Sequence, residues 1–199
     1  MSDQQVDRSK RTWLIASTCA GVAGGAATAV PFISSFQPSE RARAAGAAVE
    51  VDIGSLKAGE KLTVEWRGKP VWIIRRTPEQ LETLKKTEAL VADPKSERKP
   101  AEFTPMESTR NEWRSIKPEL LVVVGICSHL GCSPSDKFEA GPQPSLPDDW
   151  MGGFLCPCHG SLFDMAGRVY KNKPAPDNLE VPPYTFLSDT RLLIGEAKA

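Results

Sequence analysis

The sequence predicts a mostly β domain that contains one helix and is attached to a single N-terminal transmembrane helix. Three patterns support this fold class. Residues 12–39 contain no charged side chain. Residues 49–53 (VEVDI) and 62–66 (LTVEW) alternate apolar and polar side chains, as half-buried strands do. Residues 119–127 form an almost continuous apolar run, which is typical of a buried strand.

Length and charge limit the class of protein further. A chain of 199 residues suggests one domain with an appendage. Its formal net charge is zero, because 25 basic residues balance 25 acidic ones. Nucleic-acid-binding proteins usually carry a basic excess, so we expect no nucleic acid among the partners. The 17 prolines and 15 glycines indicate many turns and loops.

The uncharged stretch predicts a transmembrane anchor over residues 12–37, preceded by a short basic tail at residues 1–11. About 20 apolar residues are enough to span the hydrocarbon core of a bilayer. Pro31 lies near the far end of the stretch, where a kink costs little. Basic residues on the two sides nearly balance, so the positive-inside rule alone leaves the orientation open.

Two other interpretations of this stretch remain open. It could be a cleaved export signal, because the small residues Ala42, Ala44 and Ala45 would suit a signal peptidase. It could also be a buried helix of a soluble domain. Its length of 28 uncharged residues exceeds the usual apolar core of a signal peptide, which favours the anchor.

The composition of residues 38–48 predicts a flexible tether between the anchor and the folded head. They are mostly small residues without apolar periodicity. The alternative is that they continue the helix, because Ala and Arg are good helix formers.

The head, residues 49–199, begins with the two alternating strands. Residues 67–69 (RGK) can turn the chain into a third strand at residues 70–76. The later apolar run ends at Cys127 and therefore delivers that cysteine to a loop. Residues 190–196 have the pattern of a last strand.

One helix is predicted in the head, starting after Thr77. This residue is a good N-cap, Pro78 suits the first helical position, and Gln80 completes a capping box. An Asp–Pro pair at residues 93–94 would end the helix. Its apolar face is formed by Leu81, Leu84 and Val91.

Both histidines and four of the five cysteines lie within 33 residues, between Cys127 and His159. Two short motifs, C-x-H at Cys127–His129 and C-x-x-H at Cys156–His159, each offer one thiolate and one imidazole. Two such turns can converge on one inorganic centre. Thiolate and imidazole together suit zinc, or iron in an iron–sulfur cluster.

Other chemistry fits these residues less well. A c-type haem requires C-x-x-C-H, which this sequence lacks. A zinc site with two Cys and two His is chemically sound, although its spacing here would be unusual. Two disulfides with incidental histidines would leave the Cys–His pairing unexplained. Cys19, in the apolar N-terminal stretch, is expected to be a small buried hydrophobe.

The motifs CSHLGC (residues 127–132) and CPCHGS (residues 156–161) resemble those of the Rieske iron–sulfur proteins. In these proteins two His replace two Cys on one iron of a 2Fe–2S cluster. The apolar anchor, the tether and the segment NKPAPDNLEVPPY (residues 172–184) resemble the Rieske subunits of bacterial quinol–cytochrome c reductases. The resemblance implies a Rieske-type antiparallel β-sandwich with a small cluster-binding subdomain at about residues 121–176.

The resemblance also implies the ligands of one 2Fe–2S cluster. Cys127 and Cys156 would bind one iron, and His129 and His159 the other. Because two neutral imidazoles replace two thiolates, the cluster would accept an electron more readily than an all-cysteine cluster.

A disulfide between Cys132 and Cys158 is also implied by the resemblance, and it would join the two ligand loops. Such a bond requires an oxidising compartment, which here is the bacterial periplasm. Residues 1–11 would then be cytoplasmic, residues 12–37 would cross the bacterial inner membrane once, and residues 49–199 would be periplasmic.

Further residues would cover the cluster or tune its potential. By resemblance, Ser161 donates a hydrogen bond to a bridging sulfide, and the KPAP segment with Pro174 forms a stiff proline loop over the cluster. Lys173 stands where the family usually has Gly. Phe163 stands where many relatives have a Tyr that bonds a ligand sulfur, so a lower potential is expected. Leu130 would lie at the exposed tip.

The resemblance implies an electron-transfer subunit of ubiquinol–cytochrome c reductase, a proton-translocating oxidoreductase. His159 would hydrogen-bond ubiquinol at a site shared with cytochrome b and accept its proton. The head would then move on its tether to reduce cytochrome c1, within a dimeric complex embedded in membrane lipid.

Two alternative functions remain open. One is the Rieske domain or ferredoxin of an oxygenase system, whose members generally lack the anchor and the extra cysteine pair. The other is a zinc-structured binding module. The sequence indicates no role for residues 92–103 or 133–150.

Overall fold

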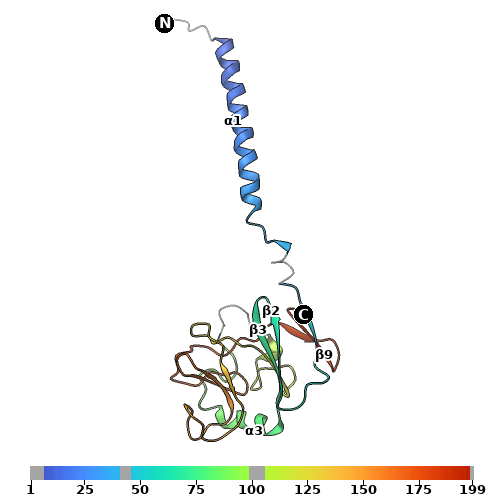
Figure 1. The fold of residues 1–199 in the computed structure, drawn as a ribbon, viewed down its shortest axis with the longest axis vertical. Helices are drawn as coiled ribbons and strands as arrows, with labels where there is room; N and C mark the ends of the chain where they lie inside the picture. Colours follow the sequence, from blue (N-terminus) through green and yellow to red (C-terminus); the bar gives the residue numbers. More distant parts are fainter. Residues whose placement is uncertain (1–6, 41–45, 99–105, 198–199) are drawn as a thin grey trace. The chain divides into compact units, whose positions relative to one another are not determined.

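The computed structural model describes residues 7–40, 46–98 and 106–197, which belong to two compact units, residues 1–44 and residues 45–199. The first unit contains the long helix α1, and the second contains the β-rich head with the labelled strands β2, β3 and β9 and the helix α3 (Figure 1). The predicted tether falls partly on residues 41–45, which lie outside the described residues.

Helix α1 (Arg8–Ser34) is long and apolar enough to cross a membrane, with a mean hydropathy of 1.4 in its most apolar part. Its 27 residues extend about 40 Å at 1.5 Å per residue, against about 30 Å for a hydrocarbon core. The Asp7 carboxylate caps its first turn by accepting from the backbone N–H groups of Ser9 and Lys10. The helix thus begins four residues earlier and ends three residues earlier than the predicted anchor, residues 12–37.

The hydroxyl groups of α1 are compatible with a lipid environment. The hydroxyls of Thr12, Thr18 and Thr28 donate to carbonyl oxygens four residues back on the same helix, at 2.8–2.9 Å. Polar groups inside a bilayer must be satisfied within the protein, and these bonds meet that requirement. All side chains of α1 are exposed within the described residues, as expected for a helix whose environment is lipid.

The described part of the head contains three antiparallel sheets of three strands each, with orders β1-β9-β8, β2-β3-β4 and β5-β6-β7. The fold is mostly β with antiparallel sheets, which confirms the predicted fold class. The strands are β1 (Val49–Asp52), β2 (Lys61–Trp66), β3 (Lys69–Arg75), β4 (Leu120–Val124), β5 (Ser135–Lys137), β6 (Gly153–Cys156), β7 (Ser161–Asp164), β8 (Tyr184–Phe186) and β9 (Arg191–Ile194).

Five of these strands match the sequence patterns, including the hairpin between β2 and β3. Arg67 and Gly68, at the tip of that hairpin, both have positive φ (54° and 73°), as a tight two-residue turn requires. Strands β5 to β8 were not predicted. Each has only three or four residues, and all of β7 is buried, so none shows a clear alternation.

Helix α3 (Pro78–Thr87) has the predicted capping box, in which Thr77 and Gln80 bond each other's backbone N–H at 2.9 and 3.2 Å. The prediction that its apolar face continues to Val91 was wrong, because the helix ends at Thr87. Val91 is instead fully buried in an isolated antiparallel bridge with Tyr170. Pairing with a distant segment outweighs the local helical pattern here. A three-residue 3₁₀ helix, η1 (Glu107–Thr109), follows later in the chain.

The core connects the sheet of β3 to the sheet that leads into the metal-binding motifs. The ring of Trp72 on β3 stacks on Phe154 of β6, with ring centroids 5.2 Å apart. Close approach requires Gly125, because a Cβ at this position would lie 2.1 Å from the Trp72 ring. Cys127 and Cys156 belong to the same buried cluster, so both are packed into the core.

Three buried arginines converge on the turn that follows β7, residues 164–167. Arg76 donates to the carbonyl oxygen of Met165 at 3.1 Å, and Arg114 donates to that of Ala166 at 3.0 Å. Arg168 forms a fully buried ion pair with Asp164 at 2.7 Å. Burial lowers the pKa values of Arg76 and Arg114 to about 10, although nearby Asp164 opposes the effect.

The buried ion pair yields a stability prediction. Arg168→Met should lower the free energy of unfolding by about 3–5 kcal/mol, because it leaves the Asp164 carboxylate buried without its cationic partner. Urea unfolding followed by circular dichroism measures the change. Lys85→Met is the matched control, since Lys85 pairs with Glu82 on the surface, and it should cost less than about 1 kcal/mol. Equal losses in the two variants would contradict the prediction.

Candidate metal centre

Two loops carry the predicted ligands, one between β4 and β5 and the other between β6 and β7, and Cys156 is the last residue of β6. In the first loop, Gly131 donates its backbone N–H to the carbonyl of Cys127 at 3.1 Å. In the second, Gly160 donates to the carbonyl of Cys156 at 3.0 Å. Both glycines have positive φ (79° and 73°), which a side chain would disfavour. Each loop is therefore a tight turn that holds its cysteine and histidine near each other.

The thiols of Cys127 and Cys156 are free and each residue is only 2% exposed. Burial raises the pKa of the Cys127 thiol, and the neighbouring Cys156 adds to this effect. Hydrogen bonds from the backbone of His129 and from the Ser161 hydroxyl lower the same pKa. Binding of a metal cation would favour the thiolate form, because a coordinating thiol loses its proton.

The imidazoles of His129 and His159 come together from the two loops, with ring centroids 4.7 Å apart and planes at 83°. The Nδ1 atom of His129 is buried without a hydrogen-bond partner among the described residues. His159 is exposed. A buried polar atom without a partner usually indicates a missing water, ion or ligand. Two buried thiols and two adjacent imidazoles therefore fit an iron or zinc site.

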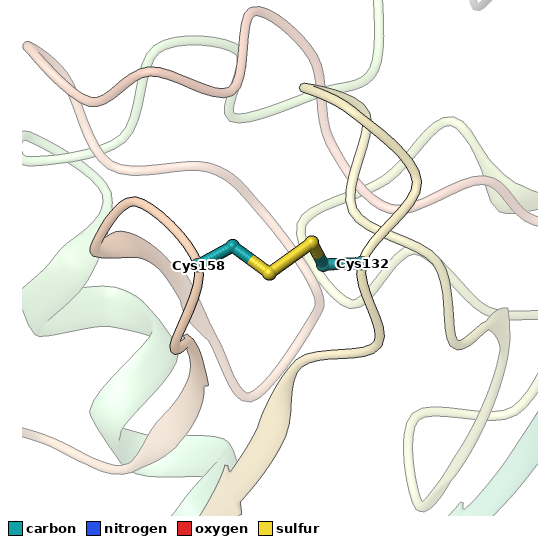
Figure 2. Close-up of a disulfide and its surroundings, with 2 residues drawn as sticks. All are labelled: Cys132 and Cys158. Atoms are coloured by element: carbon teal, nitrogen blue, oxygen red, sulfur yellow. A yellow bond between two sulfur atoms is a disulfide. The ribbon is translucent and has the colours of Figure 1, made fainter.

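A disulfide between Cys132 and Cys158 connects the two loops, which Figure 2 shows approaching from separate parts of the chain. This bond confirms the pairing that the resemblance implied. The sulfur of Cys156 lies within 4.8 Å of both disulfide sulfurs. Because those two sulfurs are bonded to each other, they are not available as metal ligands, and Cys127 and Cys156 remain as the thiol donors.

The proline loop (residues 173–176) lies against both ligand loops. The backbone N–H of Ala175 donates to the hydroxyl of Ser161 at 3.0 Å. Just after the proline loop, the carbonyl of Asp177 accepts from the hydroxyl of Ser128 at 2.6 Å, and its N–H donates back at 3.2 Å. Sequence reasoning missed Ser128. Its position between Cys127 and His129 was the available signal.

The remaining predicted residues occupy different environments. Leu130 is 70% exposed on the first loop, and Pro174 and Lys173 are exposed on the proline loop. Ser161 and Phe163 are fully buried on β7. Residues two apart on a strand share a face, so Phe163 lies on the same side of β7 as Ser161.

Comparison with known proteins agrees with this geometry. The family model described as "Rieske [2Fe-2S] domain" matches residues 86–184, so the head is a Rieske domain and its cofactor is a [2Fe–2S] cluster. The ubiquinol-cytochrome c reductase iron-sulfur subunit of Allochromatium vinosum is 51% identical over 199 residues, covering 98% of this chain and 93% of the relative. The corresponding subunit of Bradyrhizobium diazoefficiens is 40% identical over 188 residues, covering 94% of each chain.

These relatives show that the chain belongs to the family of Rieske iron–sulfur subunits of ubiquinol–cytochrome c reductases. A chain of a solved structure entitled "Hyperthermophilic respiratory Complex III" is also similar. It is 24% identical, with a TM-score of 0.45, and the match covers 89% of this chain and 97% of that one.

Removal of the disulfide should weaken both the head and its hold on the cluster. A Cys132→Ala, Cys158→Ala double variant should lose about 3.5 kcal/mol of stability, as expected for opening a loop of 26 residues. It should also release iron and sulfide faster on warming. Urea unfolding and the loss of visible absorbance measure the two effects. Cys19→Ala, which changes the free cysteine of α1, should alter neither, and a double variant as stable as this control would refute the prediction.

Proposed function

We propose that this chain is the electron-transfer subunit of a ubiquinol–cytochrome c reductase. It takes an electron, coupled to a proton, from ubiquinol at a site shared with cytochrome b, and it passes the electron to cytochrome c1. The observation that carries the proposal is the pair of buried thiols and adjacent imidazoles within a disulfide-linked pair of loops. The 51% identity to a ubiquinol-cytochrome c reductase subunit supports it.

Four residues would hold the cluster, with Cys127 and Cys156 on one iron and His129 and His159 on the other. When bound, the cluster supplies one-electron redox chemistry, at roughly −150 to +300 mV for Rieske centres. The two imidazoles contribute no negative charge, which favours a higher potential than four thiolates would. By resemblance, the hydroxyl of Ser161 would donate to a bridging sulfide and so stabilise the added negative charge.

The exposed imidazole faces the electron donor in this proposal. His159 is exposed, whereas His129 is half-buried. His159 is therefore the more accessible of the two histidines, and it would offer a ring nitrogen to a quinol hydroxyl and accept its proton. The exposed Leu130 would dock with the same partner surface, formed by cytochrome b.

The membrane arrangement follows from the disulfide and from α1. A structural disulfide persists in the periplasm rather than in the cytosol. We therefore place the head, residues 49–199, in the periplasm, residues 12–37 in the inner membrane and residues 1–11 in the cytoplasm. Residues 38–48 would be the tether that lets the reduced head travel from cytochrome b to cytochrome c1.

Two features support this function over the alternatives. An oxygenase ferredoxin would not need the cross-link at Cys132 or a helix such as α1. The zinc-module alternative does not account for the 51% identity to an iron-sulfur subunit over nearly the full chain length. The complex as a whole would be a proton-translocating oxidoreductase. We propose that this complex is a dimer.

The cluster content of the purified protein tests the proposal. The detergent-solubilised chain should contain about two irons and two acid-labile sulfides, the composition of a [2Fe–2S] cluster. After reduction it should give a Rieske-type electron paramagnetic resonance (EPR) signal. Cys156→Ala should abolish the signal, and Cys19→Ala should preserve it. Zinc in place of iron, or the absence of sulfide from the wild type, would overturn the proposal.

Phe163 provides a test of how the potential is tuned. Phe163→Tyr should raise the midpoint potential by about 40 mV, if its new hydroxyl donates a hydrogen bond that strengthens by ~1 kcal/mol on reduction. Ser161→Ala should lower the potential by a similar amount, because it removes the hydroxyl that is expected to donate to a bridging sulfide. Redox titration followed by EPR measures both values. An unchanged or lower potential in Phe163→Tyr would show that the hydroxyl does not reach a ligand sulfur.

A further inference from the structure

The segment after α3, residues 89–98, lies against the chain on both sides of the proline loop. Five hydrogen bonds join it to residues 169–178. Their donor–acceptor pairs are Lys171 N to Leu90 O, Lys171 Nζ to Ala89 O, Ala92 N to Val169 O, Asn178 Nδ2 to Asp93 O and Arg98 Nη1 to Pro176 O, all at 2.8–2.9 Å. The sequence patterns place residues 89–91 in the preceding helix and indicate no role for residues 92–98. We call residues 89–98 the cradle, because their hydrogen bonds hold the chain just before the proline loop and at its end.

Asn178 is the central side chain of the cradle and is only 6% exposed. Its Oδ1 accepts from the backbone N–H of Val169 at 2.9 Å, and its Nδ2 donates to the carbonyl of Asp93 at 2.9 Å. One bond therefore requires an acceptor and the other a donor. A carboxylate of the same shape could make the first bond but not the second, because it has no proton to donate.

The cradle segment is itself held in an unusual conformation by a buried arginine. Ser96 and Arg114 are buried and both have positive φ (55° and 52°), which is uncommon for residues other than Gly. The Nε of Arg114 donates to the Ser96 hydroxyl at 2.5 Å. Its Nη2 donates to the carbonyl of Leu179 at 2.6 Å, directly after Asn178. Tertiary bonds thus fix the cradle and the end of the proline loop together.

A path of contacts connects the cradle to the strand pair that carries a proposed ligand, Cys156. Asn178 comes directly after Ala175–Asp177, the residues that hydrogen-bond to Ser161 and Ser128. Within the loop, Ala175 donates its N–H to the Ser161 oxygen at 3.0 Å. A hydroxyl whose oxygen accepts this bond can direct its own proton elsewhere. Ser161 also lies directly opposite the proposed ligand Cys156 in the pairing of β7 with β6. A shift of the proline loop would therefore move a hydroxyl that lies beside a proposed ligand.

We propose that Asn178 is a positioning residue for the cluster, and that residues 89–98 form a cradle that holds the proline loop against the ligand loops. This inference rests on the proposed ligand set. The cradle fixes where Ala175 and its N–H lie, and through them it fixes the orientation of the Ser161 hydroxyl. Asn178 acts on the redox centre without contacting it.

Two substitutions test the cradle, each with a control of the same charge change. Asn178→Asp removes the donor to Asp93, and Asn172→Asp adds the same negative charge at the other, exposed end of the proline loop. Arg98→Gln removes the donor to Pro176, and Lys95→Gln removes the same positive charge from the exposed part of the same segment. Arg98 is exposed, so its variant decides the question if Asn178→Asp does not fold.

The full-length, detergent-solubilised protein is used for both measurements. Hydrogen exchange of the backbone N–H groups of Ala175 and Asp177 should accelerate about tenfold in Asn178→Asp relative to Asn172→Asp, since a buried bond is lost. Exchange in β3 and β4 should stay unchanged. The midpoint potential should be lower in Asn178→Asp than in Asn172→Asp, and lower in Arg98→Gln than in Lys95→Gln. A loss of stability alone would not shift the potential of the folded protein.

The outcomes separate this inference from the proposed function. Equal exchange rates and equal potentials within each pair of variants would overturn the cradle while leaving the electron-transfer function intact. Wild-type protein without iron and sulfide would instead overturn the proposed function. Even then, the exchange rates of Ala175 and Asp177 would still show whether the cradle fixes the proline loop.

Discussion

The covalent bond between Cys132 and Cys158 is the constraint on which the site depends. Each of the two loops supplies one thiol and one imidazole, which is half of the donor set. The disulfide holds the halves together, and it also removes two sulfurs near Cys156 from the possible ligands. Two thiols and two imidazoles remain, and this is the donor set of a Rieske cluster. The same bond requires an oxidising compartment, so one interaction bears on both the chemistry and the location of the head.

Burial gives the site two unlike sides. The thiol side is continuous with the apolar core, where Cys127 and Cys156 are almost fully enclosed. The imidazole side includes an exposed ring at His159, and Leu130, the residue after His129, is exposed as well. A redox centre that must meet a quinol while being shielded from bulk water needs this asymmetry. In the proposed function, the thiolates that would carry negative charge lie inside, and the imidazole that would exchange a proton lies outside.

Backbone carbonyls, more than carboxylates, hold the framework behind the site. Three buried guanidinium groups converge on the turn after β7, and most of their partners there are carbonyl oxygens. A guanidinium has five donors and can therefore join several segments that have no regular pairing with one another. Arg114 does so for the turn, for Ser96 and for Leu179. Short strands and long loops become a rigid support in this way.

The sequence by itself determined the class of the centre and most of the strands of the head. C-x-H and C-x-x-H place a thiol and an imidazole on one tight turn, and this depends only on local spacing. Alternation identified β1 and β2 because each has one buried face, whereas β7, buried throughout, showed no such signal. The extent of α3 was overestimated, because pairing of Val91 with Tyr170 ended the helical pattern.

Only the tertiary structure decided what lies around the cluster site. Ser128 meets Asp177 from 49 residues away, and Asn178 meets Asp93 from 85 residues away. No local pattern encodes such partners, because a polar side chain on a loop can equally face solvent. They are chosen when the core closes and each buried donor or acceptor must find a partner.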